Sequence, residues 1–335
     1  MTFFNFWPMT NNKINCIGIL TSGSDAPGTN SAIRSIVNIG IQQKLKVIGI
    51  QNGFEGLLTK EFTDLSTDSV ANILHRGGSI LGTAKCPNLL KEAYQKIAAK
   101  NLLETPIDAL ICIGGAGSIK GAHQIQLITQ LPGICIPATV HNDVYGTDKS
   151  IGFDTATNVA VQAIDRILDT TDKNCRIFII EVTGKDSGFV AIDVGLGCGA
   201  SEILIPDFPT SIDQIVARIE KNIGNPNKIN ILVAAEGKKP GRAYDLVESL
   251  RKRTGHEAKV CILGQLQHCG TPTAADRILG TEFGAKAIEF LFSGKINAIT
   301  ALQGAKFLPV PLDFAQREQK SLPTGLIQLA RTLSI

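Results

Sequence analysis

The sequence predicts an α/β protein of two lobes, built mainly from parallel sheets flanked by helices. Strand-length apolar runs alternate with helical patterns along most of the chain, which is typical of parallel sheets joined by right-handed crossovers. The 335 residues include 33 glycines and only 5% aromatic residues, a composition that fits a glycine-rich α/β fold. The alternation restarts after a helical pattern ending near residue 168, and a chain of this length is large enough for a second lobe.

The first half of the chain contains four strand-length apolar runs and five helical patterns. The spacing of Ile33, Ile36, Val37 and Ile41, close to one helical turn, illustrates how a helix is identified. Strands are expected at 14–20, 47–50, 107–113 and 133–136, and helices around 33–41, over 66–75 and 89–103, after residue 118, and over 154–168.

The second half continues the same alternation. Ser211 and Gln214 have the spacing of a capping box before the apolar Ile215 and Ile219. Strands are expected at 177–182, 202–205, 229–235 and 259–263, and helices after residue 211 and over 244–253 and 274–291. Three parts follow from these patterns: an N-terminal extension over 1–13, a first lobe over 14–152 plus 265–315, and a second lobe over 153–264 plus 316–335.

Charge and cysteine usage limit the classes of partner and the compartment. The 33 basic and 30 acidic residues give a net charge of +3, too balanced to indicate nucleic acid or an anionic membrane. No apolar run approaches the roughly 20 residues of a spanning helix, and the first 12 residues lack the pattern of a secretory signal. The eight cysteines show no metal-ligand spacing, so we expect a reduced, cytoplasmic protein. Cys269 beside His268 is either a reactive thiol or an inert loop residue.

Three glycine-rich loops follow expected strands or helices. The turn 114–118, Gly-Gly-Ala-Gly-Ser, lies between a strand and a helix, where close backbone approach and free N–H groups suit a phosphate. The loop 21–28 has the same position after the first strand, and the loop 76–87 adds Arg76 and Lys85 beside glycines. The Rossmann and P-loop fingerprints are both missing from the sequence, which argues against nicotinamide dinucleotide and P-loop chemistry. Glycine turns without a ligand remain the alternative.

The stretch 136–148 carries the densest set of polar side chains. It follows an expected strand and precedes an expected helix, where open α/β sheets place their chemistry. It contains Thr139, His141, Asn142, Asp143 and Asp148. Loops carry functional residues more often than core elements do, and the alternative is a surface turn rich in Asx residues.

Seven motifs, in order along residues 14–315, make the chain similar to the bacterial ATP-dependent 6-phosphofructokinase family. They are Leu-Thr-Ser-Gly-x-Asp-Ala-Pro-Gly-x-Asn, Arg-Gly-Gly-x-x-Leu-Gly-x-Ala, Ile-Gly-Gly-x-Gly-Ser, Asn-Asp-x-x-Gly-Thr-Asp, Ile-Gly-Phe-Asp-Thr-Ala, Glu-Val-x-Gly and Asp-Arg-x-Leu. The resemblance implies a two-lobed α/β fold with a nucleotide-binding lobe and a sugar-phosphate-binding lobe. It also implies a homo-oligomer, tetramer or dimer, in which ATP, Mg²⁺ and fructose 6-phosphate meet at the interlobe cleft.

The resemblance assigns the reaction centre and shows two departures there. Thr139 and Asp143 match the family, with Asp143 as the candidate metal ligand. The family's proton-accepting carboxylate is replaced by His141, and the family's metal-binding aspartate is replaced by Ala116. The implied nucleotide-binding residues are Gly23, Lys85, Cys86, Gly115, Ala116, Gly117 and Ser118. Ala138 stands where pyrophosphate-using members have lysine, which disfavours a pyrophosphate donor.

The sugar-phosphate pocket also departs from the family pattern. Lysine replaces arginine at 185 and 259 in this pocket, and at 85 on the ATP side, which keeps charge but loses bidentate phosphate geometry. The implied sugar-phosphate residues are Thr139, Arg176, Thr183, Gly184, Lys185, Glu236, Lys259, Gln265 and His268, with Arg176 reaching a neighbouring subunit's phosphate. At the family's allosteric site Arg34 is kept, while three other expected arginines are replaced.

Three hypotheses follow from this pattern. The first is a phosphofructokinase-like protein with impaired or lost kinase activity, a pseudoenzyme acting as a binding or regulatory subunit of a catalytic paralogue, or a diverged paralogue. The second is an active ATP-dependent kinase that uses His141 as its base on a different phosphorylated sugar. The third, more distant, is a related kinase acting on NAD or a lipid, against which the sugar-loop motifs count.

Overall fold

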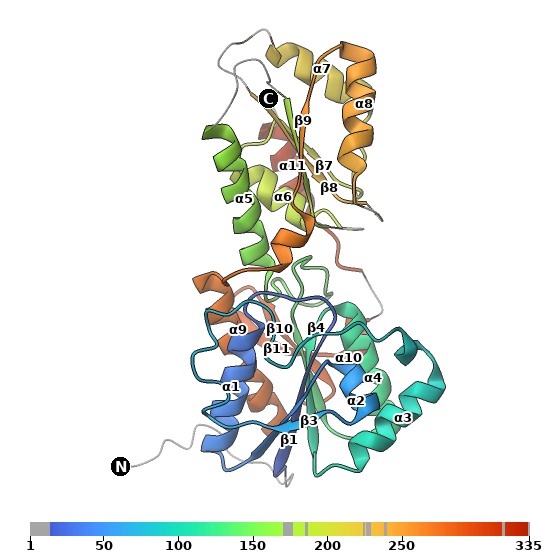
Figure 1. Ribbon diagram of the computed structural model, residues 1–335, viewed down its shortest axis with the longest axis vertical. Helices are drawn as coiled ribbons and strands as arrows, with labels where there is room; N and C mark the ends of the chain where they lie inside the picture. The colour runs from blue at the N-terminus through green and yellow to red at the C-terminus, as the bar shows by residue number, and fades with distance from the viewer. Residues whose placement is uncertain are drawn as a thin grey trace. The chain divides into compact units, whose positions relative to one another are not determined.

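The computed structural model describes residues 14–169, 177–184, 187–223, 225, 229–237, 240–316 and 319–333. The chain divides into two compact units, which Figure 1 draws with their helices and strands labelled. Unit 1 comprises the described residues of Met1–Gly152 and Cys269–Lys320, and unit 2 those of Phe153–His268 and Ser321–Ile335. The predicted extension over 1–13 lies outside the described residues.

A seven-stranded sheet forms the centre of unit 1, in the order β11-β10-β5-β4-β1-β2-β3. Its strands are β1 (Cys16–Ser22), β2 (Lys46–Ile50), β3 (Phe62–Asp64), β4 (Ala109–Gly114), β5 (Gly133–Pro137), β10 (Ala298–Gln303) and β11 (Lys306–Pro311). The edge strands β3 and β11 pair antiparallel with their neighbours, and the inner strands pair parallel. Parallel pairing through the inner strands confirms the predicted fold class.

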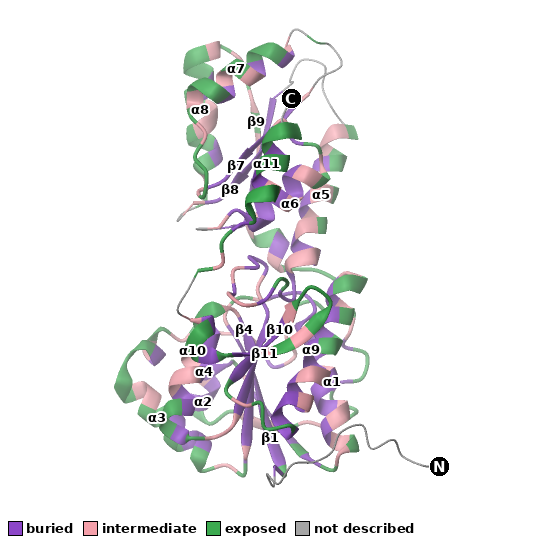
Figure 2. Cartoon of the chain, turned by 180° about the vertical axis from the view of Figure 1, so that it is seen from behind, coloured by how far each residue is buried: buried purple, intermediate pink, exposed green. Residues whose placement is uncertain are grey.

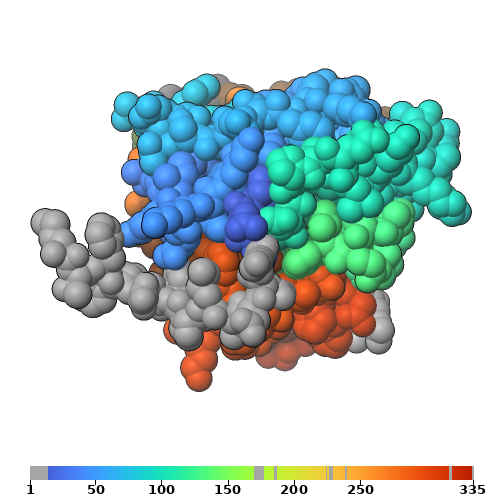
Figure 3. Space-filling model, turned by 90° about the horizontal axis from the view of Figure 1, so that it is seen from below, coloured from blue at the N-terminus to red at the C-terminus, as the bar shows by residue number. Residues whose placement is uncertain are grey.

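Helices cover both faces of this sheet because each face is apolar. They are α1 (Thr29–Gln42), α2 (Phe54–Thr59), η1 (Pro87–Leu90), α3 (Glu92–Leu103), α4 (Ala116–Thr129), α9 (Ala274–Phe292) and α10 (Leu312–Ala315). The helices α1 and α9 lie together on one face, and α2, α3, α4 and α10 on the other. Segments far apart in sequence thus share one core, and Figure 3 shows the blue N-terminal and orange α9–β11 segments side by side.

Unit 2 contains a four-stranded, fully parallel sheet in the order β7-β8-β6-β9. Its strands are β6 (Ile177–Val182), β7 (Glu202–Leu204), β8 (Asn230–Ala235) and β9 (Lys259–Ile262). Its helices are α5 (Phe153–Asp169), α6 (Phe189–Gly197), α7 (Ile212–Ile223), α8 (Arg242–Thr254), η2 (Gly264–His268) and α11 (Thr324–Leu333). The helices α5, α6 and α11 cover one face and α7 and α8 the other. In Figure 2 the buried colour concentrates on the strands of both units.

The predicted helix over 66–75 is wrong, because the structure has turns there. Val70 and Ile73 are buried, as the helical pattern suggested. However, Ser66 and Ser69 exchange side-chain-to-backbone hydrogen bonds of 3.0 and 3.3 Å, which compete with helical bonding. Asn72 adopts a left-handed φ of 57°, a conformation that interrupts a helix.

Other local predictions had mixed outcomes. The capping box is confirmed, since the Ser211 N–H donates to Gln214 Oε1 at 3.2 Å and the Gln214 N–H donates to Ser211 Oγ at 3.3 Å. The sequence analysis missed α2, β3, α6, η2 and every element after α9. Among the residues that the structure describes, none of the helices is both long and apolar enough to cross a membrane.

The boundary between the units near residue 265 is placed by buried hydrogen bonds. The side chain of Gln267 in η2 accepts the Thr183 N–H at 2.7 Å and donates to the Ala156 carbonyl at 3.0 Å. Both partners belong to unit 2, so η2 belongs there as well. The sequence analysis had assigned residues from 265 onward to the first lobe, a difference of four residues.

Candidate functional site

The carboxyl ends of β1 and β4 form the topological switch point of unit 1. From β1 the chain moves to β2 on one side, and from β4 to β5 on the other, which leaves a crevice where open sheets bind ligands. Ser22 and Gly114, the last residues of these strands, are register partners. Gly23 follows with a φ of 100°, and a Cβ there would lie 3.2 Å from Ser118 Oγ. The two glycine-rich loops therefore meet.

The turn 114–118 brings the backbone to the start of α4. A Cβ on Gly114 would lie 2.6 Å from the Ser22 carbonyl oxygen, so only glycine fits between the two loops. A Cβ on Gly117 would meet nothing within 4 Å. The first N–H groups of a helix are not used by the helix itself. An anion at this open turn can therefore accept hydrogen bonds from the start of α4.

The site loop, residues 138–152, is held by its own polar side chains. Ser150 Oγ donates to the Thr139 carbonyl at 2.7 Å, and Asn142 Nδ2 donates to the Asp148 carbonyl at 2.9 Å. At the loop's end the Gly152 N–H donates to Asp276 Oδ1 at 2.8 Å, and Asp276 is fully buried. These bonds fix the loop's backbone and so determine where its remaining side chains lie.

Thr139, His141 and Asp143 occupy the start of this loop. The His141 N–H donates to Thr139 Oγ1 at 3.2 Å, and His141 Nδ1 lies 3.4 Å from the same oxygen. The His141 side chain is buried. A Cβ on Gly115 would lie 3.4 Å from Thr139 Cβ, so Thr139 adjoins the glycine turn. The structure thus brings together the predicted catalytic threonine and histidine and the predicted nucleotide-binding turn.

The environment of Asp143 indicates whether the site can hold a metal ion. Its Oδ1 is buried and has no hydrogen-bond partner, which is unusual for a buried carboxylate oxygen. Within the described part of the chain, His, Cys, Asp and Glu side chains form no group of three that could hold a metal ion. Mg²⁺ is commonly held by one or two carboxylates together with substrate phosphates and water. The residues present fit an Mg²⁺ ion that uses Asp143 as its protein ligand.

Unit 2 gathers a second polar cluster at the carboxyl ends of β6 and β8. Thr183 Oγ1 donates to Glu236 Oε1 at 3.2 Å, and both side chains are buried. The Thr183 N–H is bonded to Gln267 as described above. A Cβ on Gly264 would lie 3.8 Å from Glu236 Oε2. One oxygen of Glu236 therefore remains beside an open glycine, where a hydroxyl group of a ligand can donate to it.

The remaining predicted site residues differ in position and exposure, and two lie outside the described residues. Lys259 begins β9 and pairs with Phe178 near the start of β6, at the opposite end of the sheet from Thr183. Lys85 is exposed, Gln265 is exposed, and His268 and Arg34 are half-buried. Arg176 and Lys185 lie outside the described residues, while Gly184 follows Thr183 directly.

Cys86, a predicted nucleotide-binding residue, is a protonated thiol near neutral pH. Burial, together with a hydrogen bond to Glu55, raises the pKa of Cys86 to about 11. A thiol in this state is a poor nucleophile and a poor metal ligand.

Sequence reasoning missed two residues that build the clusters. Ser150 fixes the Thr139 carbonyl, and Gln267 fixes the Thr183 N–H. Ser150 gave no signal in the sequence, because serines are common in loops. Gln267 lies between the two predicted residues Gln265 and His268. A glutamine between two predicted site residues could have been suspected of bonding to the neighbouring strands from the buried side of a short helical turn.

Comparison with known proteins identifies the family. The family model described as Phosphofructokinase matches residues 16–291. The chain is 41% identical over 320 residues to the ATP-dependent 6-phosphofructokinase of Thermotoga neapolitana, covering 95% of this chain and 99% of the relative. It is 42% identical over 294 residues to that of Coxiella burnetii, covering 88% and 90%. The phosphofructokinase structure from Saccharomyces cerevisiae matches with a TM-score of 0.84 at 27% identity, covering 95% of this chain and 46% of that one. These matches confirm the resemblance drawn from the motifs, and the chain belongs to the phosphofructokinase family.

Proposed function

We propose that this protein binds ATP and a sugar phosphate in the manner of its relatives but transfers the phosphoryl group far more slowly than an ordinary kinase. The relatives' names give ATP as the donor and fructose 6-phosphate as the acceptor. The proposal rests on two replacements that occur together: Ala116 at the start of α4 and His141 in the site loop. Both positions carry carboxylates in the family pattern described above.

The physical reason lies in the charge of the transition state. Phosphoryl transfer relies on metal ions that neutralise developing charge and on a base that orients the attacking hydroxyl. An alanine side chain contributes no ligand to Mg²⁺. A neutral histidine can accept a proton but adds no negative charge near the metal. Loss of a positioned base alone commonly lowers the rate by about 10²–10⁴-fold, so loss of both groups leaves little turnover.

The binding apparatus is better preserved than the reaction centre. The open turn 114–118 and the free side of Glu236 support nucleotide and sugar binding respectively. In this proposal Asp143 holds Mg²⁺ through the oxygen that has no protein partner. The protein then acts in the cytoplasm as a binding or regulatory component of sugar-phosphate metabolism.

A homo-oligomer is part of the same proposal. It rests on the family resemblance, which implies a tetramer or dimer. Lys259, at the end of its sheet opposite Thr183, would then serve a neighbouring subunit's ligand, as is expected for Arg176. A catalytic paralogue is the second candidate partner.

The second candidate function is an active kinase with a different sugar phosphate. It is favoured by the contact between His141 Nδ1 and Thr139 Oγ1, which orients the imidazole beside the glycine turn. A histidine in this position would be the base, and the lysine replacements would adapt the pocket to another anion.

A steady-state kinase assay separates the two functions. Purified protein is given ATP, Mg²⁺ and either fructose 6-phosphate or one of a panel of other sugar phosphates, and ADP release is measured. We expect turnover at least about 100-fold below the ordinary range of about 1–100 s⁻¹ with every substrate. The paired change Ala116→Asp with His141→Asp should raise turnover with fructose 6-phosphate at least about 10-fold above either single change, because the two groups act as a unit.

Two results of this assay would contradict the proposal. Ordinary turnover by the unmodified protein with fructose 6-phosphate would refute it. Ordinary turnover with another sugar phosphate, abolished by His141→Asn, would establish the second function instead. Binding of nucleotide is measured separately by calorimetry, so that loss of binding is not mistaken for loss of chemistry.

A further inference from the structure

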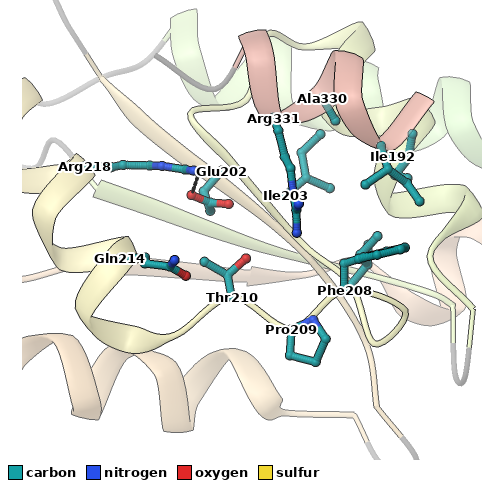
Figure 4. Close-up of a pocket in the computed structure, with 12 residues that line it drawn as sticks. Ile192, Glu202, Ile203, Phe208, Pro209, Thr210, Gln214, Arg218, Ala330 and Arg331 are labelled. Atoms are coloured by element: carbon teal, nitrogen blue, oxygen red, sulfur yellow. Dashed lines mark hydrogen bonds and ion pairs between the residues drawn. The ribbon is translucent and has the colours of Figure 1, made fainter. Parts of the chain in front are cut away.

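A cavity of about 240 Å³ lies at the open edge of the sheet in unit 2. Strand β7 is the edge strand, and the cavity is enclosed by β7, the segment after it, and helices α6, α7 and α11 (Figure 4). It shares no lining residue with the Thr183–Glu236–Gln267 cluster. The proposed function therefore gives this cavity no role.

One side of the cavity is apolar. Ile192, Ile203, Ile205 and Ile327 are buried side chains from three elements of the unit and belong to one hydrophobic cluster. Phe208 adds an aromatic ring that is 39% exposed. This side favours a ligand with an apolar body, because contact with it removes apolar surface from water.

The cavity's single carboxylate is already engaged. Glu202 is buried and forms an ion pair with Arg218 of α7. Burial raises the pKa of the Glu202 carboxyl, and the charges of Arg218 and Arg331 oppose this effect. A carboxylate paired in this way holds α7 to the edge strand, and it is not available to bind a cation. The ion pair therefore forms part of the cavity wall and does not bind a ligand.

Arg331 provides the positive charge that the Glu202–Arg218 ion pair does not neutralise. Its guanidinium lies 5.4 Å from the centroid of the Phe208 ring, which positions the group by a cation–π contact. Among the residues that the structure describes, no carboxylate lies within ion-pair distance of Arg331. In Figure 4 its side chain extends from α11 into the cavity. The guanidinium therefore presents unused N–H donors to whatever occupies the space.

Two further donors lie on the same polar side. Gln214 uses its side-chain oxygen to accept the Ser211 N–H, which leaves its amide N–H groups to donate. The Thr210 hydroxyl also lines the cavity. With two arginines and one glutamate the lining carries one net positive charge. A cation is disfavoured by this balance, and an anion of one charge is favoured.

We infer that this cavity binds a small organic anion, whose carboxylate or phosphate group is held by Arg331, Gln214 and Thr210 and whose apolar body contacts the isoleucine side. The volume is below the usual range of about 300–1,000 Å³ for ligand pockets, so the ligand is compact and smaller than a nucleotide. Carboxylates and phosphate monoesters share the required chemistry, because both accept hydrogen bonds from a guanidinium.

Isoleucine-methyl NMR of the full-length protein tests the inference directly. Benzoate, 3-methylbutanoate and phenyl phosphate are titrated separately, with benzyl alcohol as the neutral probe of similar size. We expect saturable shifts of the Ile192, Ile203 and Ile327 methyl signals with at least one anion at a dissociation constant of about 0.1–1 mM. Methyl groups of the unit 1 core, such as Ile111, should not move. The comparison of benzoate with phenyl phosphate identifies the preferred anionic group.

Two arginine variants test whether Arg331 binds the anionic group of the ligand. Arg331→Gln keeps a long polar side chain at an exposed position, and we expect it to weaken binding of the anion at least about 10-fold. Arg251→Gln, at an exposed position on α8 outside the cavity, is the matched control and should leave binding unchanged. Melting temperatures of both variants verify that they fold.

Three results would overturn the inference. The first is that no anion shifts the cavity methyl signals at about 20 mM, well above the expected dissociation constant. The second is that benzyl alcohol binds as tightly as benzoate, which would reduce the cavity to an apolar hole. The third is that the folded Arg331→Gln protein binds the anion as tightly as the unmodified protein.

Discussion

Single side chains in the site loop divide into those that hold the loop and those that are left for a ligand. Asp148 belongs to the first kind, since its Oδ2 accepts the Gly304 N–H at 2.6 Å. Asp143 belongs to the second, because its Oδ1 is buried without a partner. A buried acceptor without a hydrogen bond costs stability, and such costs are typically retained where function requires them.

The two aspartates should therefore respond oppositely to alanine. Asp143→Ala should leave the free energy of unfolding equal to or above that of the unmodified protein, whereas Asp148→Ala should lower it by about 1 kcal/mol through the lost hydrogen bond. Asp143→Ala should also abolish the additional rise in melting temperature that Mg²⁺ gives in the presence of ADP. Urea denaturation and thermal melts measure both effects. A loss of about 2 kcal/mol in Asp143→Ala would show that the carboxylate has a structural partner.

The residues that sequence reasoning placed correctly are those fixed by local chain geometry. Thr139 and His141 are two residues apart in one loop, and the glycine turn follows the neighbouring strand, so their proximity followed from the strand order of an open sheet. Lys259 was grouped with Thr183 from the resemblance alone, and the structure places it at the other end of the sheet within one chain. The resemblance grouped residues by ligand and gave no information on which end of the sheet each one occupies.

At the level of elements, unit 1 depends on the close approach of α1 and α9. A Cβ on Gly280 would lie 2.7 Å from the Gly28 carbonyl oxygen, and a Cβ on Gly284 would lie 2.7 Å from the Ala32 carbonyl oxygen. Two glycines one helical turn apart thus let the backbone of α9 contact that of α1. The sequence analysis predicted both helices but not their contact, because glycine spacing within a helix gave no information about the partner.

Alanine at these glycines should separate the helices. We expect Gly284→Ala to lower the free energy of unfolding by about 1–3 kcal/mol, since backbone atoms of α1 cannot yield to the added methyl group. The matched control is Gly325→Ala in α11, where a Cβ would meet nothing within 4 Å. That change should raise stability by about 0.5–1 kcal/mol, because alanine favours the helix. Equal effects of the two changes in urea denaturation would contradict the role assigned to the α1–α9 contact.

Sequence reasoning made two kinds of error: it predicted one helix where there is none, and it missed elements that do form. The 66–75 segment contains the apolar spacing of a helix, yet serine side chains bond its backbone and Asn72 turns it. Helix α6 is almost wholly apolar, and it is buried over most of its length. A helix without a polar face shows no periodicity, so its sequence did not distinguish it from a loop or strand.

On the scale of the whole molecule, the fold class was predictable because the alternation of strand and helix extends through both units. The strands after α9 were not, since β10 and β11 complete the sheet of unit 1 from a distant part of the chain. Each unit has its own sheet and its own hydrophobic clusters. Stabilisation by a ligand is therefore expected to begin locally, in the unit that supplies the contacts.

Hydrogen exchange of the full chain tests whether each ligand acts through its own unit. ATP should slow exchange in peptides containing the turn 114–118 of unit 1, because the ligand's phosphates occupy N–H groups at the start of α4. Fructose 6-phosphate should slow exchange in peptides containing Thr183 and η2 of unit 2, because in the proposed function Glu236, which is bonded to Thr183, accepts hydrogen bonds from the sugar. Glu236→Gln keeps an acceptor for Thr183 but removes the charge, so it should weaken protection by the sugar phosphate about 10-fold in ligand concentration while leaving protection by ATP unchanged. Two results would mean that the assignment of ligands to the two units is wrong. One is that ATP protects only peptides of unit 2. The other is that the sugar phosphate still protects the Glu236→Gln protein at the original concentration.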